Sequence, residues 1–204
     1  MRVVLSLILS LSCLPAIAQE GPSFDCSKAT SSAEELICAD ADLAKLDRIV
    51  AERFSAALSV AGALDAGAEK AVADLRTYQR GWIGGRDECW KASDLRSCVE
   101  QAYLTREGQL VAYWMLEEPT GTAFWTCDGN PANEVVTMFF DTTLPSARIE
   151  RGDRVSTASL SPTGSGSRYD GDFGQFIWIK GDEATYREPD PDGTSHACVL
   201  ASSN

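Results

Sequence analysis

The spacing of the apolar residues changes once along this chain of 204 residues, near residue 118. Before that point, between residues 25 and 114, apolar side chains recur every three to four positions, which is the period of an amphipathic helix. A short helix is predicted to start at Ser31 or Ser32, because a glutamate follows either serine three residues later, as in a capping box. Three longer helices, enough for a small bundle, are predicted around residues 43–58, 72–83 and 95–114.

After residue 118 apolar and polar residues alternate, and turn residues recur every eight to twelve positions, which predicts short antiparallel strands. Eight such strands can close into a small barrel, and closure removes exposed strand edges. We therefore predict an α+β protein with two separate domains. A disulfide-stapled helical bundle occupies residues 19–117, and a small eight-stranded antiparallel β-barrel occupies residues 118–204. The candidate strands are residues 123–127, 134–140, 146–150, 154–159, 167–170, 175–179, 183–188 and 195–200.

The first 18 residues have the pattern of a signal peptide. Arg2 supplies the positive charge, residues 3–11 are apolar, and Ala16 and Ala18 form the small-residue cleavage pattern. We expect cleavage after Ala18 and a periplasmic mature protein without a membrane span. A lipid anchor on Cys13 is the competing interpretation, but the position three residues before it is Ser10, where a lipoprotein signal usually has leucine.

Six cysteines remain after removal of the signal peptide, and an even number in an oxidising compartment predicts three disulfides. Fifteen pairings are possible for six cysteines. Their clustering makes two local loops and one long loop the simplest solution, although crossed pairing within the helical part stays open. No neighbouring pair has the two-to-four-residue spacing of a zinc knuckle. The expected pairs are Cys26 with Cys38, Cys89 with Cys98, and Cys127 with Cys198.

The composition excludes several classes of function. The formal net charge is −12 and no basic run is present, so nucleic acid is not expected as a partner. His196 is the only histidine and is expected to be structural, and we expect no metal and no cofactor. Paired acids such as Asp170 with Asp172 could serve a glycosidase, but a chain with 30 acidic residues produces such pairs by chance. Binding is therefore favoured over catalysis.

The helical part contains a series of short motifs in a fixed order. They are Phe24-Asp25-Cys26-Ser27-Lys28-Ala29, Glu34-Glu35-Leu36-Ile37-Cys38, Asp42-Leu43-Ala44-Lys45-Leu46-Asp47, Gln79-Arg80-Gly81-Trp82, and Arg86-Asp87-Glu88-Cys89 followed by Cys98. Over residues 22–112 this order resembles the LprI-type helical domain, whose members have been linked to lysozyme inhibition. Gly81, Gly84 and Gly85 depart from a plain helix, so we expect the helix that carries them to be weakened or to end early.

The barrel part contains three further motifs, Phe124-Trp125-Thr126-Cys127-Asp128-Gly129, Thr163-Gly164-Ser165-Gly166-Ser167-Arg168-Tyr169 and Trp178-Ile179-Lys180-Gly181-Asp182-Glu183-Ala184. Over residues 123–200 they resemble the MliC/PliC-type inhibitors of c-type lysozyme. The resemblance implies lysozyme contacts at Ser165 and Lys180, with Tyr169 shaping the loop. We expect the lysozyme-binding residues to be these three and the glycines of the two turns, Gly164, Gly166 and Gly181. Thr163 and Ile179 replace the family's usual polar residues.

The chemistry of lysozyme fits this resemblance. Lysozyme cleaves with one protonated and one ionised carboxyl group, in a cleft on a cationic body. An acidic inhibitor would be steered to that body, and the ammonium of Lys180 would hold the catalytic acid in its ionised form. We therefore expect c-type lysozyme as the partner and residues 118–204 as the main inhibitory part. Oligomeric state is not predicted.

Two alternatives remain. Gly-Ser-Gly stretches are common hairpin connections, and a lysine before a glycine is commonly a solvated strand end. The helical domain could also recognise another partner, which would make this an envelope binding or stress protein with the barrel as a spacer.

Overall fold

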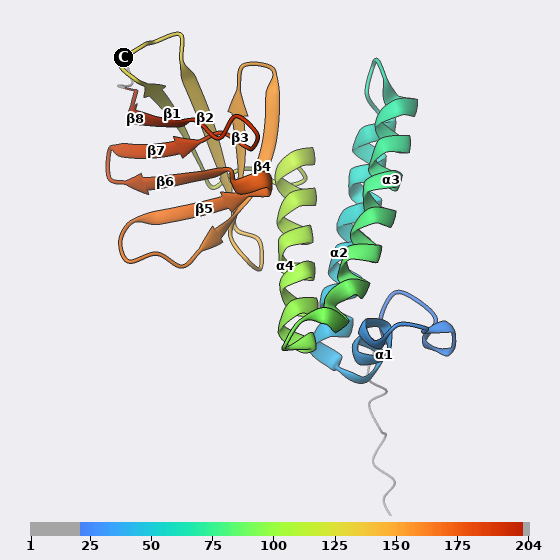
Figure 1. The fold of residues 1–204 in the computed structure, drawn as a ribbon. Helices are drawn as coiled ribbons and strands as arrows, with labels where there is room; N and C mark the ends of the chain where they lie inside the picture. The colour runs from blue at the N-terminus through green and yellow to red at the C-terminus, as the bar shows by residue number, and fades with distance from the viewer. Residues whose placement is uncertain (1–20, 202–204) are drawn as a thin grey trace, which may run out of the picture.

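A computed structural model describes residues 21–201 of the chain, and the expected signal peptide, residues 1–18, lies outside the described residues. The first half of the described chain is helical (Figure 1). The predicted helices are confirmed, and the capping box at the start of α1 is formed by Ser31 with Glu34. The α-helices are α1 (Ser32–Ala39), α2 (Ala41–Gly62), α3 (Ala68–Asp87) and α4 (Leu95–Trp114), and the short 3-10 helices are η1 (Cys26–Lys28) and η2 (Glu88–Lys91).

The second half is a closed barrel in which each strand pairs antiparallel with the next and β8 pairs with β1, as predicted. Its core is formed by alternate inward-facing side chains, among them Trp125, Ile149 and Ile177. A 3-10 helix, η3 (Asp172–Gly174), connects two of the strands. The strands are β1 (Gly121–Cys127), β2 (Glu134–Phe140), β3 (Ser146–Arg151), β4 (Arg154–Ser161), β5 (Ser167–Gly171), β6 (Phe176–Lys180), β7 (Glu183–Arg187) and β8 (Ser195–Leu200).

Three disulfides connect cysteines within residues 21–201. Cys26 bonds to Cys38 and Cys89 to Cys98, so each of the two helical bridges closes a short local loop. Cys127 bonds to Cys198, directly opposite it where β1 meets β8. These are the three pairs that the clustering of the cysteines favoured, and the third joins the first and last strands of the barrel.

Helix α3 is longer than we expected. It runs without interruption through Gly81, Gly84 and Gly85 to Asp87, so the expectation of an early ending is wrong. The reason is tertiary packing by two residues of α3 that lie between and after these glycines, Trp82 and Arg86. The ring of Trp82 packs edge-on against Tyr103 of α4, and Arg86 is buried between the helices, where its Nη1 donates a hydrogen bond of 2.8 Å to the hydroxyl of Tyr103. These contacts outweigh the low helix propensity of glycine.

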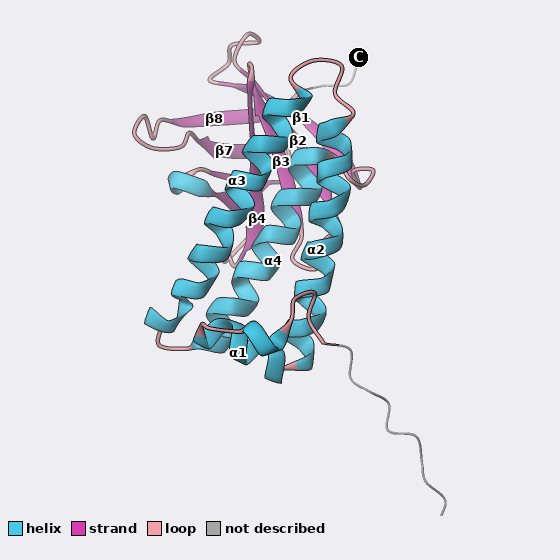
Figure 2. Cartoon of the chain, turned by 90° about the vertical axis from the view of Figure 1, so that its right-hand side faces the viewer, coloured by secondary structure: helices cyan, strands magenta, loops and turns pink. Residues whose placement is uncertain are grey.

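Helix α4 packs on both halves of the molecule. One face contributes Val99, Tyr103 and Leu110 to the helical core. Its other face places Val111 and Ala112 against Phe140 of the barrel in a second buried apolar cluster. Figure 2 shows α4 between the other helices and the strands. The two halves are therefore in direct apolar contact.

Gly108 lies where α4 approaches the barrel most closely. A methyl group added to Gly108 would lie 2.8 Å from the Cβ atom of Ser146 on β3. Beside it, the backbone N–H of Thr143 donates a hydrogen bond to the carboxylate of Glu107, and Arg148 donates one to the carbonyl oxygen of Tyr113. A residue without a side chain is required here for the two halves to dock.

We expect Gly108→Ala to destabilise the protein by about 1 kcal/mol or more, although alanine is the better helix former. Overpacking costs about 1–3 kcal/mol, which exceeds the 0.5–1 kcal/mol or so gained by replacing a helical glycine. Gly84→Ala is the matched control, because nothing lies near that exposed glycine of α3, and it should raise stability. Urea unfolding measures both changes. Equal stabilisation by the two substitutions would contradict the close approach of α4.

The barrel end that holds the β1–β2 connection contains a charged cluster around the single histidine. Nδ1 of His196 lies 2.7 Å from a carboxylate oxygen of Asp128, and Nε2 lies 2.7 Å from one of Glu188. Arg151 pairs with the same Glu188. The hydrogen bond to Asp128, supported by Glu188, raises the pKa of His196 above its ordinary value of 6.5. The position is consistent with the structural role expected for this residue.

This geometry predicts a pH dependence of stability. Because the pKa of His196 is raised on folding, protonated His196 stabilises the folded protein. This contribution to stability is complete below the unfolded-state pKa of about 6.5, and it is lost as the pH rises through the higher folded-state pKa. The melting temperature should therefore fall above pH 6.5. In His196→Gln that decline should flatten, as measured by thermal scans from pH 5 to 9. If the melting temperature of His196→Gln falls as steeply as that of the parent protein, groups other than His196 cause the decline.

Candidate functional site

The two motifs expected to contact a partner lie at the same end of the barrel. In an antiparallel barrel alternate connections share an end. The β4–β5 loop, residues 162–166, and the β6–β7 turn, residues 181–182, are such alternate connections. In Figure 1 both project at the left edge of the barrel, away from the helices. Backbone topology therefore brings the two sequence motifs together on a free surface.

Gly166 is the residue at which the two segments touch. Its φ angle is +70°, in the left-handed region that favours glycine. A methyl group at this position would lie 2.1 Å from the carbonyl oxygen of Ile179 and 3.0 Å from Cγ of Lys180. The loop therefore lies directly against the end of β6, and only glycine permits this contact.

Trp178 connects the loop to the lysine. Its indole Nε1 donates a hydrogen bond of 2.8 Å to the carbonyl oxygen of Ser165. Nζ of Lys180, two residues further along β6 and on the same face, lies 3.6 Å from the centroid of the Trp178 ring. A cation above an indole face is attracted by the ring's electron density. Trp178 thus fixes both the loop backbone and the position of the ammonium group.

The side chains of this site are available to a partner. Ser165 and Lys180 are exposed, as are the glycines Gly164, Gly166 and Gly181 of the two turns. Within residues 21–201 no carboxylate forms an ion pair with Lys180. The nearest acidic residue in strand register is Glu183, which stands opposite Lys180 across the β6–β7 hairpin. The site thus presents a positive charge without an internal counterion.

Tyr169 has a different environment from the other five candidate residues. Its side chain packs against the barrel core, and its ring centroid lies 5.3 Å from that of Phe139 on β2. Burial raises the pKa of its phenol group. Tyr169 therefore packs on the inner side of β5, beneath the loop, and the structure does not bring its side chain to the surface formed by Ser165 and Lys180.

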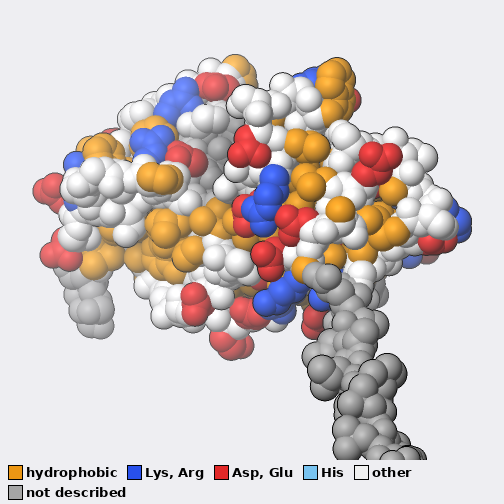
Figure 3. Space-filling model, turned by 90° about the horizontal axis from the view of Figure 1, so that it is seen from below, with side chains coloured by type: hydrophobic (Ala, Val, Ile, Leu, Met, Phe, Trp, Pro, Cys, Tyr) orange, Lys and Arg blue, Asp and Glu red, His pale blue; other side chains and the backbone are white. Residues whose placement is uncertain are grey.

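A shallow depression borders Trp178 and Lys180 on the outside of the barrel. It has a volume of about 540 Å³ and crosses β6, β7, β8 and β1, with Asp128 and Glu183 among its lining residues. Seen from below the view of Figure 1, acidic and basic side chains are interspersed on the molecular surface (Figure 3). On this face the acidic side chains are therefore not gathered into one patch.

These features define a barrel that displays a glycine-rich loop and a lysine, joined to a disulfide-bonded helical part. The comparison with known families agrees with this description. Residues 26–110 match the family described as lysozyme inhibitor LprI, and residues 125–195 match the family described as membrane-bound lysozyme-inhibitor of c-type lysozyme, MliC. The predicted order, an LprI-type helical part followed by an MliC-type barrel, is confirmed. Both families are named for lysozyme inhibition, which supports a role as an inhibitor rather than an enzyme.

Individual relatives extend the likeness across the two parts. The chain is 29% identical over 153 residues to the Lipoprotein LprI of Mycobacterium bovis and to that of Mycobacterium tuberculosis, covering 73% of this chain and 71% of each relative. It is 40% identical over 90 residues to an uncharacterized protein of Rhizobium meliloti, covering 41% of this chain and 63% of that protein. Among the described helices, none has the length and apolar character needed to cross a bilayer.

The sequence identified most of this site, but not its central residue. Trp178 stands in the same motif as Lys180, but the resemblance implies no contact for it. The structure buries Trp125 and places Trp178 on the outer face, beside Lys180. The signal that could have shown this is the period of two along β6, which puts residues 178 and 180 on one face of the strand.

Proposed function

We propose that this protein is a periplasmic inhibitor of c-type lysozyme that inserts the 163–166 loop and Lys180 into the active-site cleft of the enzyme. The observation that carries the proposal is the exposed Lys180, which has no counterion within residues 21–201 and is held on the Trp178 ring against the loop. A rigid, unneutralised cation at the tip of an acidic protein is suited to a cleft lined with carboxyl groups. The match of residues 125–195 to a family named for inhibition of c-type lysozyme supports the same partner.

The mechanism follows from the chemistry of the target. Lysozyme needs one carboxyl group protonated as general acid and a second one ionised. An ammonium group placed between them favours the ionised form of both, and so removes the proton that the reaction requires. The narrow turn built on Gly164 and Gly166 gives the loop a small cross-section, and Ser165 can both donate and accept a hydrogen bond within the cleft. The net negative charge of the chain accelerates encounter with a cationic enzyme.

We further propose that the functional division of the chain falls near residue 118, between α4 and β1, with residues 118–204 making the main inhibitory contacts. The helical part, residues 19–117, also matches an inhibitor family and can add affinity through its attachment to the barrel. We propose cleavage after Ala18 without lipid attachment. Since the mycobacterial relatives are named lipoproteins, the mass of the mature protein is the direct test. A mature chain that starts at a lipid-modified Cys13 would overturn this assignment.

Inhibition of c-type lysozyme by the full mature chain is the primary test, and Gly166→Ala tests the site. The added methyl group cannot coexist with the carbonyl oxygen of Ile179, so the loop must move away from Lys180. We expect at least about tenfold weaker inhibition, equivalent to loss of one well-placed contact. Activity is measured by clearance of bacterial cell walls.

Gly152→Ala is the matched control for this variant. Gly152 also has a positive φ, of 59°, but it lies in the β3–β4 turn at the other end of the barrel and has nothing within 4 Å of an added methyl group. It should carry a similar backbone strain and retain inhibition. Equal inhibition by both variants and the parent protein would place the inhibitory surface elsewhere. A parent chain without any effect on lysozyme would refute the proposed function itself.

A further inference from the structure

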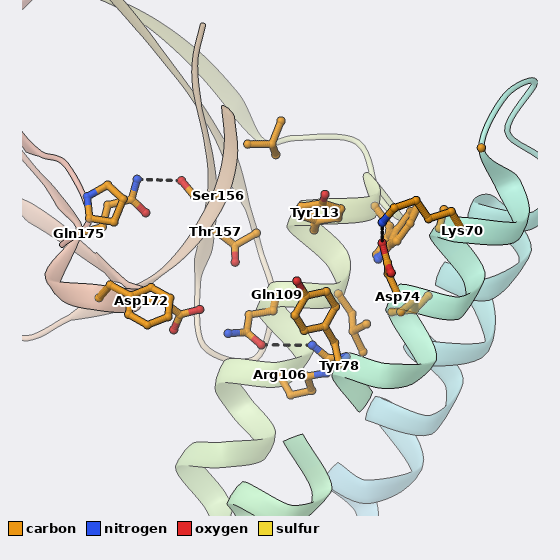
Figure 4. A pocket seen from close by; sticks show the side chains of 18 residues that line it. Lys70, Asp74, Tyr78, Arg106, Gln109, Tyr113, Ser156, Thr157, Asp172 and Gln175 are labelled. Carbon is orange, nitrogen blue, oxygen red and sulfur yellow. Dashed lines mark hydrogen bonds and ion pairs between the residues drawn. The ribbon is translucent and has the colours of Figure 1, made fainter. Parts of the chain in front are cut away.

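A cavity lies between the helical part and the barrel, on the side where α3 faces β4 and η3. Its volume is about 630 Å³, within the range typical of small-molecule sites. Helices α3 and α4 form one wall, with Tyr78, Arg106 and Gln109, and the barrel forms the other, with Thr157, Asp172 and Gln175. Figure 4 shows these side chains around the cavity. It is distant from the 163–166 loop, since η3 connects strands at the opposite barrel end.

Arg106 is the unusual residue of this cavity. Arg106 is only 8% exposed, yet its guanidinium group forms no ion pair with any carboxylate in residues 21–201. Its Nε and Nη2 donate hydrogen bonds of 3.0 and 2.8 Å to the amide oxygen of Gln79, and its Nη1 donates a longer one of 3.4 Å to that of Gln109. Burial alone lowers the pKa of its guanidinium to about 10.

A buried guanidinium without a counterion is costly, because neutral amide oxygens compensate its charge only in part. The group carries five N–H donors in a planar fork, and three hydrogen bonds to amides leave donors free. The other charged groups of the cavity do not neutralise it. Lys70 pairs with Asp74, and Asp172 is exposed on η3 without an ion pair to Arg106. Arg106 is therefore left without an ion-pair partner within residues 21–201.

Two aromatic rings flank the entrance. Tyr78 on α3 is 72% exposed and Phe173 on η3 is 76% exposed. Phe173 has a φ angle of +55°, a conformation that is costly for an aromatic residue. Both residues line the cavity from opposite walls. They offer flat apolar surfaces to the body of a ligand whose charged end reaches Arg106.

We propose that this cavity binds a small organic carboxylate, with its charged group on Arg106 and its body between Tyr78 and Phe173. A carboxylate matches the planar donor fork of arginine, and the aromatic walls suit either an aromatic acid or the apolar face of an acidic sugar. This inference is independent of the lysozyme-binding proposal, because the two sites are formed by different ends of the barrel and share no residue.

The test is an NMR titration of the full mature chain with two matched pairs of probes, benzoate against benzamide, and N-acetylmuramic acid against N-acetylglucosamine. In each pair only the first carries a carboxylate. At least one acid should shift the amide signals of Gln109, Thr157 and Asp172 together, and its neutral counterpart should bind at least about tenfold more weakly. The pair that responds identifies the source of the carboxylate, aromatic or saccharide.

Two variants and a control localise the binding. Arg106→Gln should weaken binding of the acid at least about tenfold, and Tyr78→Ala, a change at an exposed residue that leaves folding intact, should weaken it several-fold. Arg80→Gln on α3 removes the same charge from an exposed site outside the cavity and should leave binding unchanged. If Arg106→Gln does not fold, Tyr78→Ala and the two pairs of probes still show whether the acid binds in this cavity. The proposal is overturned if neither acid shifts these signals, if each acid binds like its neutral counterpart, or if Arg80→Gln has the effect of Arg106→Gln.

Discussion

Arg86→Met is expected to destabilise the helical part by about 3–5 kcal/mol, the usual cost of removing one partner from a buried charge network. Arg86 is 4% exposed and binds the hydroxyl of Tyr103 and the carboxylate of Asp87. The Tyr103 hydroxyl in turn donates a hydrogen bond of 2.8 Å to Asp47 on α2. Burial raises the pKa of Tyr103, so its hydroxyl keeps the proton that it donates. Nη1 of Arg86 also lies 4.0 Å from a carboxylate oxygen of Asp47. Methionine retains the packing of the side-chain stem but leaves the buried Asp47 carboxylate without this cation.

Urea unfolding measures the loss, and Arg96→Met is the control. Arg96 on α4 pairs with Asp40 and Glu100, but its side chain is 42% exposed, and such surface pairs contribute little. Its removal should therefore cost much less. A double variant, Arg86→Met with Asp47→Leu, should recover part of the stability, because it also removes the stranded carboxylate. A loss for Arg86→Met no larger than that for Arg96→Met would show that this network does not stabilise the fold.

The sequence predicted the secondary structure closely, because the period of the apolar residues is strong in both halves. It could not predict the course of α3, since Gly81 and Gly84 have low helix propensity and the compensating contact, Trp82 on Tyr103, is tertiary. Nor did it predict how the two halves meet. Helix α4 is apolar on two faces, and a period alone does not say that Val111 and Ala112 pack on Phe140 of the barrel.

The candidate site shows the same limit. Lys180 and the 163–166 loop could be predicted because a resemblance to known motifs marks them. Trp178 stands in the same motif as Lys180, but the resemblance gives it no role. Its hydrogen bond to the Ser165 carbonyl oxygen depends on the close approach of the β4–β5 loop to β6 that Gly166 allows. Arg106 was not predicted either. An arginine in a helix commonly reaches solvent, and its burial arises only when α3, through Gln79, closes over it.

The largest effect on function is expected at Lys180. Lys180→Ala should weaken inhibition by about 2–5 kcal/mol, the cost of truncating one partner of a desolvated charge pair. Ser165→Ala should cost only about 0.5–1.5 kcal/mol, the value of a neutral hydrogen bond. Both residues are exposed and no described carboxylate pairs with the ammonium, so both variants should keep nearly the melting temperature of the parent. Inhibition constants for c-type lysozyme measure the difference.

Lys180→Met separates the charge from the packing of the side chain. Methionine keeps much of the contact that the lysine stem makes with the Trp178 ring but has no ammonium, so a loss close to that of Lys180→Ala would assign the effect to the charge. Added salt should slow association of every variant, because it screens the field of the acidic body. It should change the difference between Lys180→Met and the parent only slightly, since a contact within the closed cleft is shielded from salt. If Lys180→Met and Ser165→Ala both inhibit like the parent, these segments are ordinary turns and the inhibitory surface belongs to another part of the molecule.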